Sequence, residues 1–199
     1  MSKSYFNEKA AIWDERVAEK DLTSLENIAG SLTIEAGSTV LDVGTGTGVF
    51  TPFILSRLGE NGKLVCLDFA EEMLKIFRSK GFEGNIEYIC ADIAASGLDD
   101  ETFDAVVCYS SFPHFQDKPG ALNEISRILK DDGRLYICHT SSRLAINNLH
   151  HRIPEVHNDH IPDEVKMRQL LSTAGFEKIN IFDNEDSYLA SGRKPAKVS

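Results

Sequence analysis

Three glycines alternate with threonines directly after an apolar run, in the sequence VLDVGTGTG of residues 40–48. Glycine lets the backbone bend sharply and lets a ligand approach where any Cβ atom would collide. A strand that ends in such a loop before a helix is the usual ligand-binding point of an α/β sheet. Dinucleotide-binding loops, which hold a pyrophosphate, have the spacing G-x-G-x-x-G instead. Asp42, two residues before the first glycine, would repel a pyrophosphate but could hold the ammonium group of an amino acid.

Two further acidic residues follow the next two apolar runs of the chain. Asp68 ends the run LVCLD, where a carboxylate can accept hydrogen bonds from both hydroxyls of a ribose. Asp92 comes after the run IEYIC, where it can accept a hydrogen bond from the amino group of an adenine. Each charged hydrogen bond of this kind contributes about 1.5–3 kcal/mol. Any one of these acids could be a solvated loop carboxylate, but three of them beside one glycine loop indicate a nucleoside-binding site.

Short apolar runs and amphipathic helical patterns alternate along the chain and would position these residues. Runs of this length, rich in Val, Ile, Leu and Tyr, are typical of strands that are covered on both faces. The predicted strands are Thr39–Val43, Leu64–Asp68, Ile86–Cys90, Phe103–Ser110 and Leu135–His139. Apolar residues repeat at helical spacing from Ala70 to Phe77 and from Leu122 to Leu129, and a further helix is expected to begin near Val49. This alternation predicts an α/β fold with a doubly wound parallel sheet.

Two flanking regions extend this core. The apolar stripe of an N-terminal amphipathic helix is formed by Phe6, Ala10, Trp13 and Val17. Near the C-terminus, Asp163 can cap a helix that stops at Gly175. Strands Lys178–Phe182 and Ser187–Ser191 follow, and the short connection between them forces an antiparallel pair at the end of the sheet. No linker or repeat interrupts residues 1–199, so we expect a single domain.

The composition argues against several classes of protein. The 199 residues include 21 basic and 31 acidic side chains, a net charge of -10, so nucleic acid is a disfavoured partner. No apolar run approaches the roughly 20 residues that span a bilayer, and the N-terminus lacks the apolar stretch of a signal peptide. Cys66, Cys90, Cys108 and Cys138 each lie inside an apolar run and form no CxxC pair, so we expect free thiols in the core. Free core thiols favour a cytoplasmic protein.

The chain contains, in this order, the stretches LDVGTGTG, VCLDFAEEML, CADI, FDAVVCYSSFPHF and ALNEISRILKDDGRLYI. This ordered set resembles the class I S-adenosylmethionine-dependent methyltransferases, from about Tyr5 to the end of the chain. The N-terminal YFNEKAAIWDER is similar to the cap of the branch that includes the quinone-biosynthesis methyltransferases. The resemblance implies a Rossmann-like, seven-stranded, mostly parallel sheet with an antiparallel last strand and an N-terminal helical cap of residues 1–30. The chain departs from the family pattern at residues 130–133, KDDG instead of the frequent KPGG, and at Ala70, where many members have a serine helix cap.

The resemblance also implies the cofactor, S-adenosylmethionine, and the product S-adenosylhomocysteine. The implied contacts of the methionine part are Asp42, Gly44, Thr45, Gly46, Gly48, Tyr109 and Ser110. Those of the ribose and adenine are Asp68, Phe69, Asp92 and Ile93. We therefore expect methyl transfer by in-line displacement, in which the enzyme holds the nucleophile, the methyl carbon and the sulfur collinear.

An oxygen or nitrogen nucleophile can need a general base, and histidine is the obvious candidate. The candidates are His114, after the fourth strand, His139, at the end of the fifth strand, and His150 and His151 further on. Packing is an equally good explanation of His114. Residues 140–162 form a histidine-rich insertion where this architecture usually covers the substrate, and we expect it to close over the acceptor. No metal is expected, because the spacing matches no standard zinc pattern; the residues that could still bind one are His150, His151, His157 and His160, with Glu155 and Asp159.

We therefore predict an S-adenosylmethionine-dependent methyltransferase that acts on a small-molecule acceptor. The aromatic residues expected near the acceptor suit a planar or hydrophobic molecule, and equally suit core packing; they are Tyr5, Phe6, Trp13, Phe112 and Phe115. Alternatives are a methyltransferase that acts on a nucleic acid or a protein, and a non-catalytic cofactor-binding module. An NAD-dependent dehydrogenase is opposed by Asp42 and by the glycine spacing. The sequence leaves the identity of the acceptor and the oligomeric state open.

Overall fold

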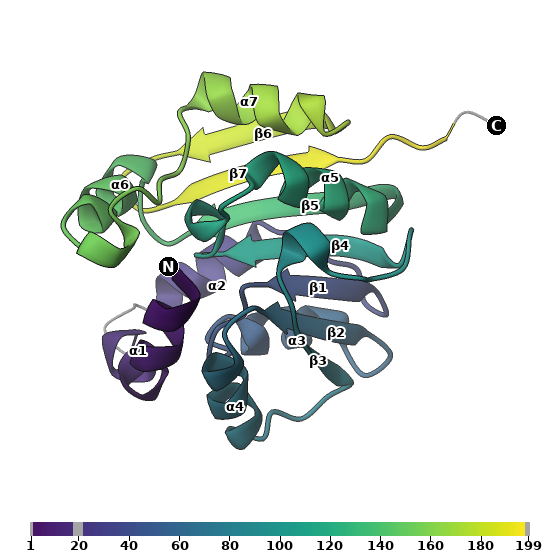
Figure 1. The fold of residues 1–199 in the computed structure, drawn as a ribbon. Helices are drawn as coiled ribbons and strands as arrows, with labels where there is room; N and C mark the ends of the chain where they lie inside the picture. Colours follow the sequence, from purple (N-terminus) through teal and green to yellow (C-terminus); the bar gives the residue numbers. More distant parts are fainter. Residues whose placement is uncertain (1, 18–21, 198–199) are drawn as a thin grey trace.

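The structure is a computed structural model that describes residues 2–17 and 22–197. Within these residues, seven strands form one sheet in the order β3-β2-β1-β4-β5-β7-β6 (Figure 1). The strands are β1 Thr39–Val43, β2 Lys63–Asp68, β3 Ile86–Cys90, β4 Phe103–Tyr109, β5 Leu129–His139, β6 Glu177–Asp183 and β7 Tyr188–Arg193. Neighbouring strands from β3 to β5 run parallel, and β7 is antiparallel to both β5 and β6. The predicted doubly wound sheet, with an antiparallel last strand, is confirmed.

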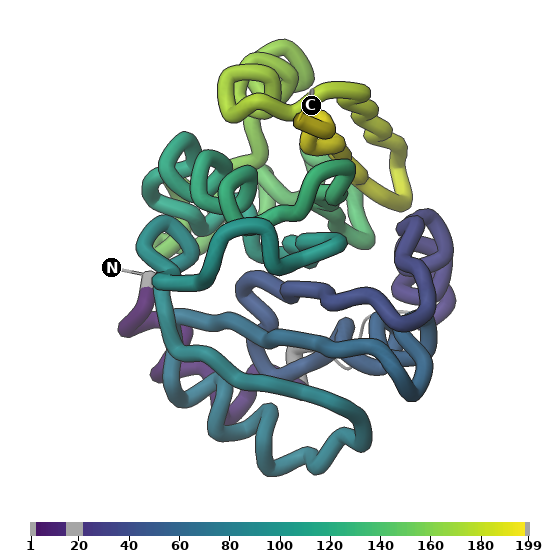
Figure 2. The backbone as a smooth tube through the Cα atoms, turned by 90° about the vertical axis from the view of Figure 1, so that its right-hand side faces the viewer, coloured from purple at the N-terminus to yellow at the C-terminus, as the bar shows by residue number. Residues whose placement is uncertain are grey.

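Helices cover both faces of this sheet. They are α1 Ser2–Val17, α2 Leu22–Gly30, α3 Thr51–Leu58, α4 Glu71–Ser79, α5 Lys118–Ile128, α6 Arg143–His151 and α7 Glu164–Thr173, with the 3₁₀ helices η1 Ile93–Ala95, η2 Phe112–His114 and η3 Pro154–Val156. Leu41 of β1 packs in one apolar cluster with α5 and α7, whereas Val40 packs in a second cluster with α2 and α3. Figure 2 shows the α2 and α5 segments on opposite sides of the strands. Among the described residues, no helix is long and apolar enough to cross a membrane.

The starts of α7 and α3 have recognisable local causes. The side chain of Asp163 accepts a hydrogen bond of 2.8 Å from the backbone N–H of Lys166, which confirms the predicted cap of α7. α3 begins at Thr51 with Phe50 as its N-cap, close to the expected start near Val49. Pro52 lies in its first turn, where a missing N–H leaves no helical hydrogen bond unmade.

The prediction for the start of β5 is wrong. Apolar spacing places Leu129 on a helix and the sequence of residues 130–133 suggests a turn, but α5 ends before Leu129 and β5 begins there. Leu129 pairs with Phe103 of β4, next to an irregularity in the strand register. Because this partner lies far away in the sequence, the local pattern contains no sign of the pairing.

Cys90 is exposed, whereas Cys66, Cys108 and Cys138 are buried. All four are free thiols, as expected, but the prediction that Cys90 lies in the core is wrong. Cys90 is the last residue of β3, which ends the sheet on one side. The thiol is therefore not enclosed between two neighbouring strands.

The N-terminal region forms two helices with different positions. Tyr5, Phe6 and Ala10 of α1 pack in a third apolar cluster with Met73 of α4. α2 instead packs with α3 in the cluster on the sheet face. The helix that lies across the carboxyl ends of the central strands is therefore α1 (Figure 1). The side chain of Val17, expected on the apolar stripe, lies outside the described residues.

Candidate active site

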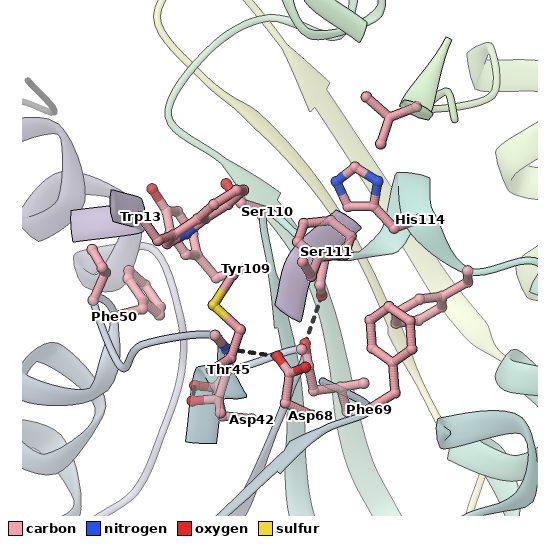
Figure 3. A pocket seen from close by; sticks show the side chains of 18 of the residues that line it. Trp13, Asp42, Thr45, Phe50, Asp68, Phe69, Tyr109, Ser110, Ser111 and His114 are labelled. Atoms are coloured by element: carbon pink, nitrogen blue, oxygen red, sulfur yellow. Dashed lines mark hydrogen bonds between the residues drawn. The ribbon is translucent and has the colours of Figure 1, made fainter. Parts of the chain in front are cut away.

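A cavity of about 570 Å³ opens at the carboxyl ends of β1, β2 and β4, next to α1 and α6 (Figure 3). Cavities of about 300–1,000 Å³ are typical of cofactor and small-molecule sites. The expected cofactor residues that line it are Asp42, Gly44, Thr45, Gly46, Asp68, Phe69, Asp92, Ile93, Tyr109 and Ser110. The expected contact at Gly48 is absent from this lining. The structure thus brings the residues of successive strand ends together around one space.

The three glycines of the loop have different roles. A Cβ atom on Gly44 would lie 2.4 Å from the Cβ atom of Ser111, and one on Gly48 would lie 2.5 Å from the ring of Phe77. Packing therefore requires glycine at both positions. Gly46 has φ +56 and lines the cavity, and its Cβ would meet no protein atom within 4 Å. Gly46 is therefore the glycine that leaves room for a ligand at the backbone.

Asp42 places a carboxyl group at the bottom of the cavity. It is 1% exposed and accepts a hydrogen bond of 2.7 Å from the hydroxyl of Thr45. Burial raises the pKa of Asp42 to about 7; the hydrogen bond from Thr45 lowers the pKa, and the charge of Asp68 raises it. A cation in the cavity would favour the ionised form, so the site is suited to an ammonium group.

Asp68 is held in a fixed orientation by two backbone N–H groups. Its Oδ2 accepts from Gly46 and its Oδ1 accepts from Ala70, both at 2.8 Å. Each carboxylate oxygen has room for a further hydrogen bond, so the pair can receive the two hydroxyls of a ribose. Burial raises the pKa of Asp68 to about 6, although both backbone hydrogen bonds and the charge of His114 lower it. The bond to Ala70 also satisfies the N–H just before α4, where the family often has a serine cap.

Aromatic and polar groups complete this half of the cavity. Tyr109 stacks on Phe50 with ring centroids 4.4 Å apart, and its hydroxyl lies 3.3 Å from the Oγ1 of Thr140. Ser110 follows with φ +53, a conformation that non-glycine residues rarely adopt and that is common at functional sites. Asp92 is exposed and lines the cavity, and its Oδ1 accepts a hydrogen bond from the backbone N–H of Ala94 at the start of η1.

Helix α1 is tied to the glycine loop by polar contacts that sequence reasoning missed. The hydroxyl of Thr47 donates to Asp14 at 2.6 Å. Lys80, just after α4, forms an ion pair of 2.8 Å with Asp14 and donates to the backbone carbonyl of Thr47 at 2.7 Å. Phe6 of α1 adds an edge-to-face contact with Phe69, with ring centroids 5.8 Å apart. The three polar partners lie on separate segments, so their sequence spacing indicates nothing.

Three of the four histidine candidates line the cavity. His114, His139 and His150 do so, whereas His151 is exposed on the outer side of α6 and is not part of the lining. α6 begins at the cap Ser142, and it brings His150 beside His114 with ring centroids 4.8 Å apart. The histidines of the cavity therefore come from β5, α6 and the η2 turn after β4.

The histidine-rich segment is held by hydrogen bonds to backbone carbonyls. The Nδ1 atoms of His157 and His160 bond to the carbonyls of Pro154 and Asn158, at 2.6 and 2.9 Å. In the part of the chain that the structure describes, no three His, Cys, Asp or Glu side chains form a group that could hold a metal ion. His150, His151, His157 and His160 thus do not converge on one point.

The comparisons with known proteins agree with this geometry. Residues 41–137 match the model of a methyltransferase domain family. The chain is 32% identical over 178 residues to the ubiquinone/menaquinone biosynthesis C-methyltransferase UbiE of Escherichia coli. This alignment covers 75% of this chain and 70% of the relative. It is 29% identical over 187 residues to the corresponding protein of Cronobacter sakazakii, in an alignment that covers 80% of this chain and 74% of the relative.

Solved structures show the same fold. A chain of the complex between the Haloferax volcanii Trm112 methyltransferase activator and a methyltransferase has a TM-score of 0.77 and 22% identity, covering 96% of this chain and 97% of that one. A SAM-dependent methyltransferase from Aquifex aeolicus has a TM-score of 0.70 and 23% identity, covering 85% and 89%. The chain belongs to the class I S-adenosylmethionine-dependent methyltransferases. Its cofactor is S-adenosylmethionine, and the buried acids around the open backbone of Gly46 fit this molecule.

Proposed function

We propose that this methyltransferase transfers the methyl group of S-adenosylmethionine to a small, hydroxylated aromatic or quinol-like acceptor that carries no anionic group. The observation that carries the proposal is the lining of the cavity beyond the buried acids. The apolar part of this lining includes Tyr5, Phe6, Phe115, Ile146, Leu149, Ile153 and Val156. Among the described residues that line the cavity there is no lysine or arginine, so a phosphate or carboxylate on the acceptor would find no cation to pair with.

The chain's part in the reaction is to hold the acceptor in line with the transferable methyl group. S-adenosylmethionine supplies a methyl group on a positively charged sulfur. The sulfur leaves as a neutral thioether, so the leaving group needs no acid. Asp42 would hold the methionine part of the cofactor and Asp68 its ribose, while the aromatic rings of α1 and the wall from residues 140–162 exclude water and orient the acceptor. Such alignment can supply about 7–11 kcal/mol of the barrier.

The curated relatives support the ring-shaped acceptor. They are named as C-methyltransferases of ubiquinone and menaquinone biosynthesis, and the chain is 29–32% identical to them. A nucleic acid fits less well, because the net charge is -10 and three acids, Asp42, Asp68 and Asp92, line the cavity. The buried thiols of Cys66, Cys108 and Cys138 fit a reducing compartment, so a cytoplasmic location is part of the proposal.

A methyl-transfer screen tests the proposal. The purified protein is incubated with methyl-labelled S-adenosylmethionine and, in separate reactions, a naphthoquinol, a catechol, phosphoethanolamine, total RNA and a protein extract. We expect label in the quinol or the catechol. Label only in phosphoethanolamine, RNA or protein would contradict the proposed acceptor class. Calorimetry with S-adenosylmethionine in the same preparation verifies that the cofactor site is intact.

A further inference from the structure

One acidic residue orients two of the histidines that line the cavity. The Oδ2 atom of Asp159 lies 2.8 Å from the Nδ1 atom of His114. The backbone carbonyl of the same Asp159 lies 2.7 Å from the Nδ1 atom of His150. The side chains of His114 and Asp159 are only 13% and 11% exposed, so this pair is largely shielded from water. Both imidazoles are therefore held through Nδ1, and both line the cavity. Figure 3 shows the ring of His114 there.

These contacts define the tautomer of each ring. Burial raises the pKa of Asp159, but hydrogen bonds from His114 and Gln116 and the charges of His114 and Lys118 hold it below its usual value. An ionised carboxylate only accepts hydrogen bonds, so in the neutral form of His114 the proton is on Nδ1 and Nε2 has a free lone pair. A carbonyl also only accepts, so the same holds for His150. Burial, and then the charge of His114, lower the pKa of His150, which keeps that ring neutral.

Charged and titratable groups from several elements surround His114. Asp159 contacts it directly, and Asp68 of β2 is close enough that the charge of His114 lowers the pKa of Asp68. Of the basic groups nearby, Lys118 carries a charge that acts on Asp159, whereas His150 stays neutral. Phe6 of α1 covers the ring edge-on, with centroids 5.0 Å apart. His114 can thus take up a proton while a carboxylate stabilises the resulting imidazolium.

We propose that His114, oriented by Asp159, is the general base that ionises a hydroxyl group of the acceptor, and that His150 accepts a second hydrogen bond from the acceptor and so positions it. This inference rests on the proposed hydroxylated acceptor. In the step, the O–H bond breaks, the proton moves to Nε2 of His114, and the electron pair stays on the oxygen. The oxygen, or a ring carbon that it activates, then bonds to the methyl carbon as the carbon–sulfur bond breaks and the sulfur keeps that electron pair. His114 afterwards loses its proton to water; after attack by carbon, the ring carbon also releases its own proton.

An optical experiment without turnover tests the proton transfer. The protein, loaded with S-adenosylhomocysteine, is titrated with 4-nitrocatechol, whose visible absorption changes when a hydroxyl ionises. We expect the wild-type protein to bind the probe in ionised form at a pH where the free probe is protonated, a shift of at least tenfold in its ionisation equilibrium. His114→Gln should bind the probe with this shift abolished, and Asp159→Asn should reduce the shift. His157→Gln, an exposed histidine of the same segment, is the matched control and should keep it.

The outcomes separate this inference from the proposed function. Binding of neutral probe by the wild type, or full ionisation by His114→Gln, would overturn the role of His114 and leave the acceptor class standing. Failure of the wild type to bind the probe, measured by equilibrium dialysis, would contradict the proposed acceptor class together with this inference. With an acceptor found in the screen, His114→Gln should lower kcat by about 10²-fold or more at pH 7 with little change in KM. That loss should shrink as the pH rises toward the pKa of the acceptor, which a purely structural role of His114 would not produce.

Discussion

The hydroxyl of Thr47 in the glycine loop donates a hydrogen bond of 2.6 Å to Asp14 of α1, so two segments that line the cavity are directly joined. Lys80 forms an ion pair with Asp14 and donates a hydrogen bond to the backbone carbonyl of Thr47. Movement of α1 away from the cavity must break these contacts. This small network therefore helps to hold α1 against the glycine loop.

Replacement of Lys80 by methionine should loosen α1. Lys80 and Asp14 are partly exposed, so we expect the loss to be about 1 kcal/mol, or roughly a fivefold faster release of S-adenosylhomocysteine. Stopped-flow fluorescence measures this rate, and hydrogen exchange of α1 reports the opening itself. Lys75→Met on α4 is the matched control, because Lys75 pairs with Glu71 and Glu72 of its own helix. Equal release rates in both variants would show that the contact to Asp14 does not hold the helix.

Asp42→Asn should stabilise the free protein and weaken cofactor binding. The pKa of Asp42 is raised from 3.8 to about 7 in the folded state, so its ionisation destabilises the fold. That cost is absent below about pH 4 and complete above about pH 7. We expect the midpoint of thermal unfolding to rise by about 3–10 °C at pH 8, for a gain of about 1–3 kcal/mol, and by much less at pH 5.

The affinity of the same variant for S-adenosylmethionine should fall by about 10- to 100-fold, which corresponds to one lost charged hydrogen bond. The control is Asp131→Asn, which replaces an exposed acid near the start of β5, the end away from the cavity. It should change neither the midpoint of thermal unfolding nor the affinity for S-adenosylmethionine. An Asp42→Asn protein with unchanged affinity would show that the cofactor's ammonium group is held elsewhere.

Cofactor binding should release protons near neutral pH. In the free protein the pKa values of Asp42 and Asp68 are about 7 and about 6. A bound cation and ribose favour the ionised carboxylates, so binding lowers both pKa values. The affinity should therefore fall as the pH drops through this range. Calorimetry at pH 6.5 in two buffers of different ionisation enthalpy measures the release, and identical heats in both would rule it out.

Gly46→Ala should abolish cofactor binding at a modest cost in stability. Gly46 and Gly37 have φ +56 and +82, and a Cβ atom on either would meet no protein atom within 4 Å. Both alanine variants should therefore lose about 1 kcal/mol of stability from the positive φ. Of the two, Gly46 lines the cavity and Gly37 does not, so we expect Gly37→Ala to bind S-adenosylmethionine normally. Equal binding by the two variants would contradict the assignment of Gly46 as the point of ligand approach.

The sequence predicts the parallel part of the fold well, because β1, β2 and β4 are largely buried and therefore appear as continuous apolar runs. β1 and β3 have the predicted bounds, and the buried acids Asp42 and Asp68 lie at the strand ends where the pattern places them. The prediction fails at Leu129, because pairing with Phe103 outweighs a helical spacing that is locally reasonable.

The acceptor half of the site is less accessible to sequence reasoning. His114 and Asp159 lie on separate segments and meet only through the fold, so neither position indicates the other. Asp159 appeared in the sequence only as a candidate metal ligand. The closeness of Thr47, Asp14 and Lys80 depends in the same way on how α1 packs on α4. The sequence does indicate the histidine-rich segment of residues 140–162, and His150 of this segment lines the cavity.

Exposed Cys90 immediately precedes Ala91, which lines the cavity, while the remaining three thiols are shielded. A maleimide fluorophore should consequently couple to the native chain at this one position, with no engineered substitution. The dye would lie at the adenine end of the cavity, so its emission would follow the arrival and departure of nucleosides in real time.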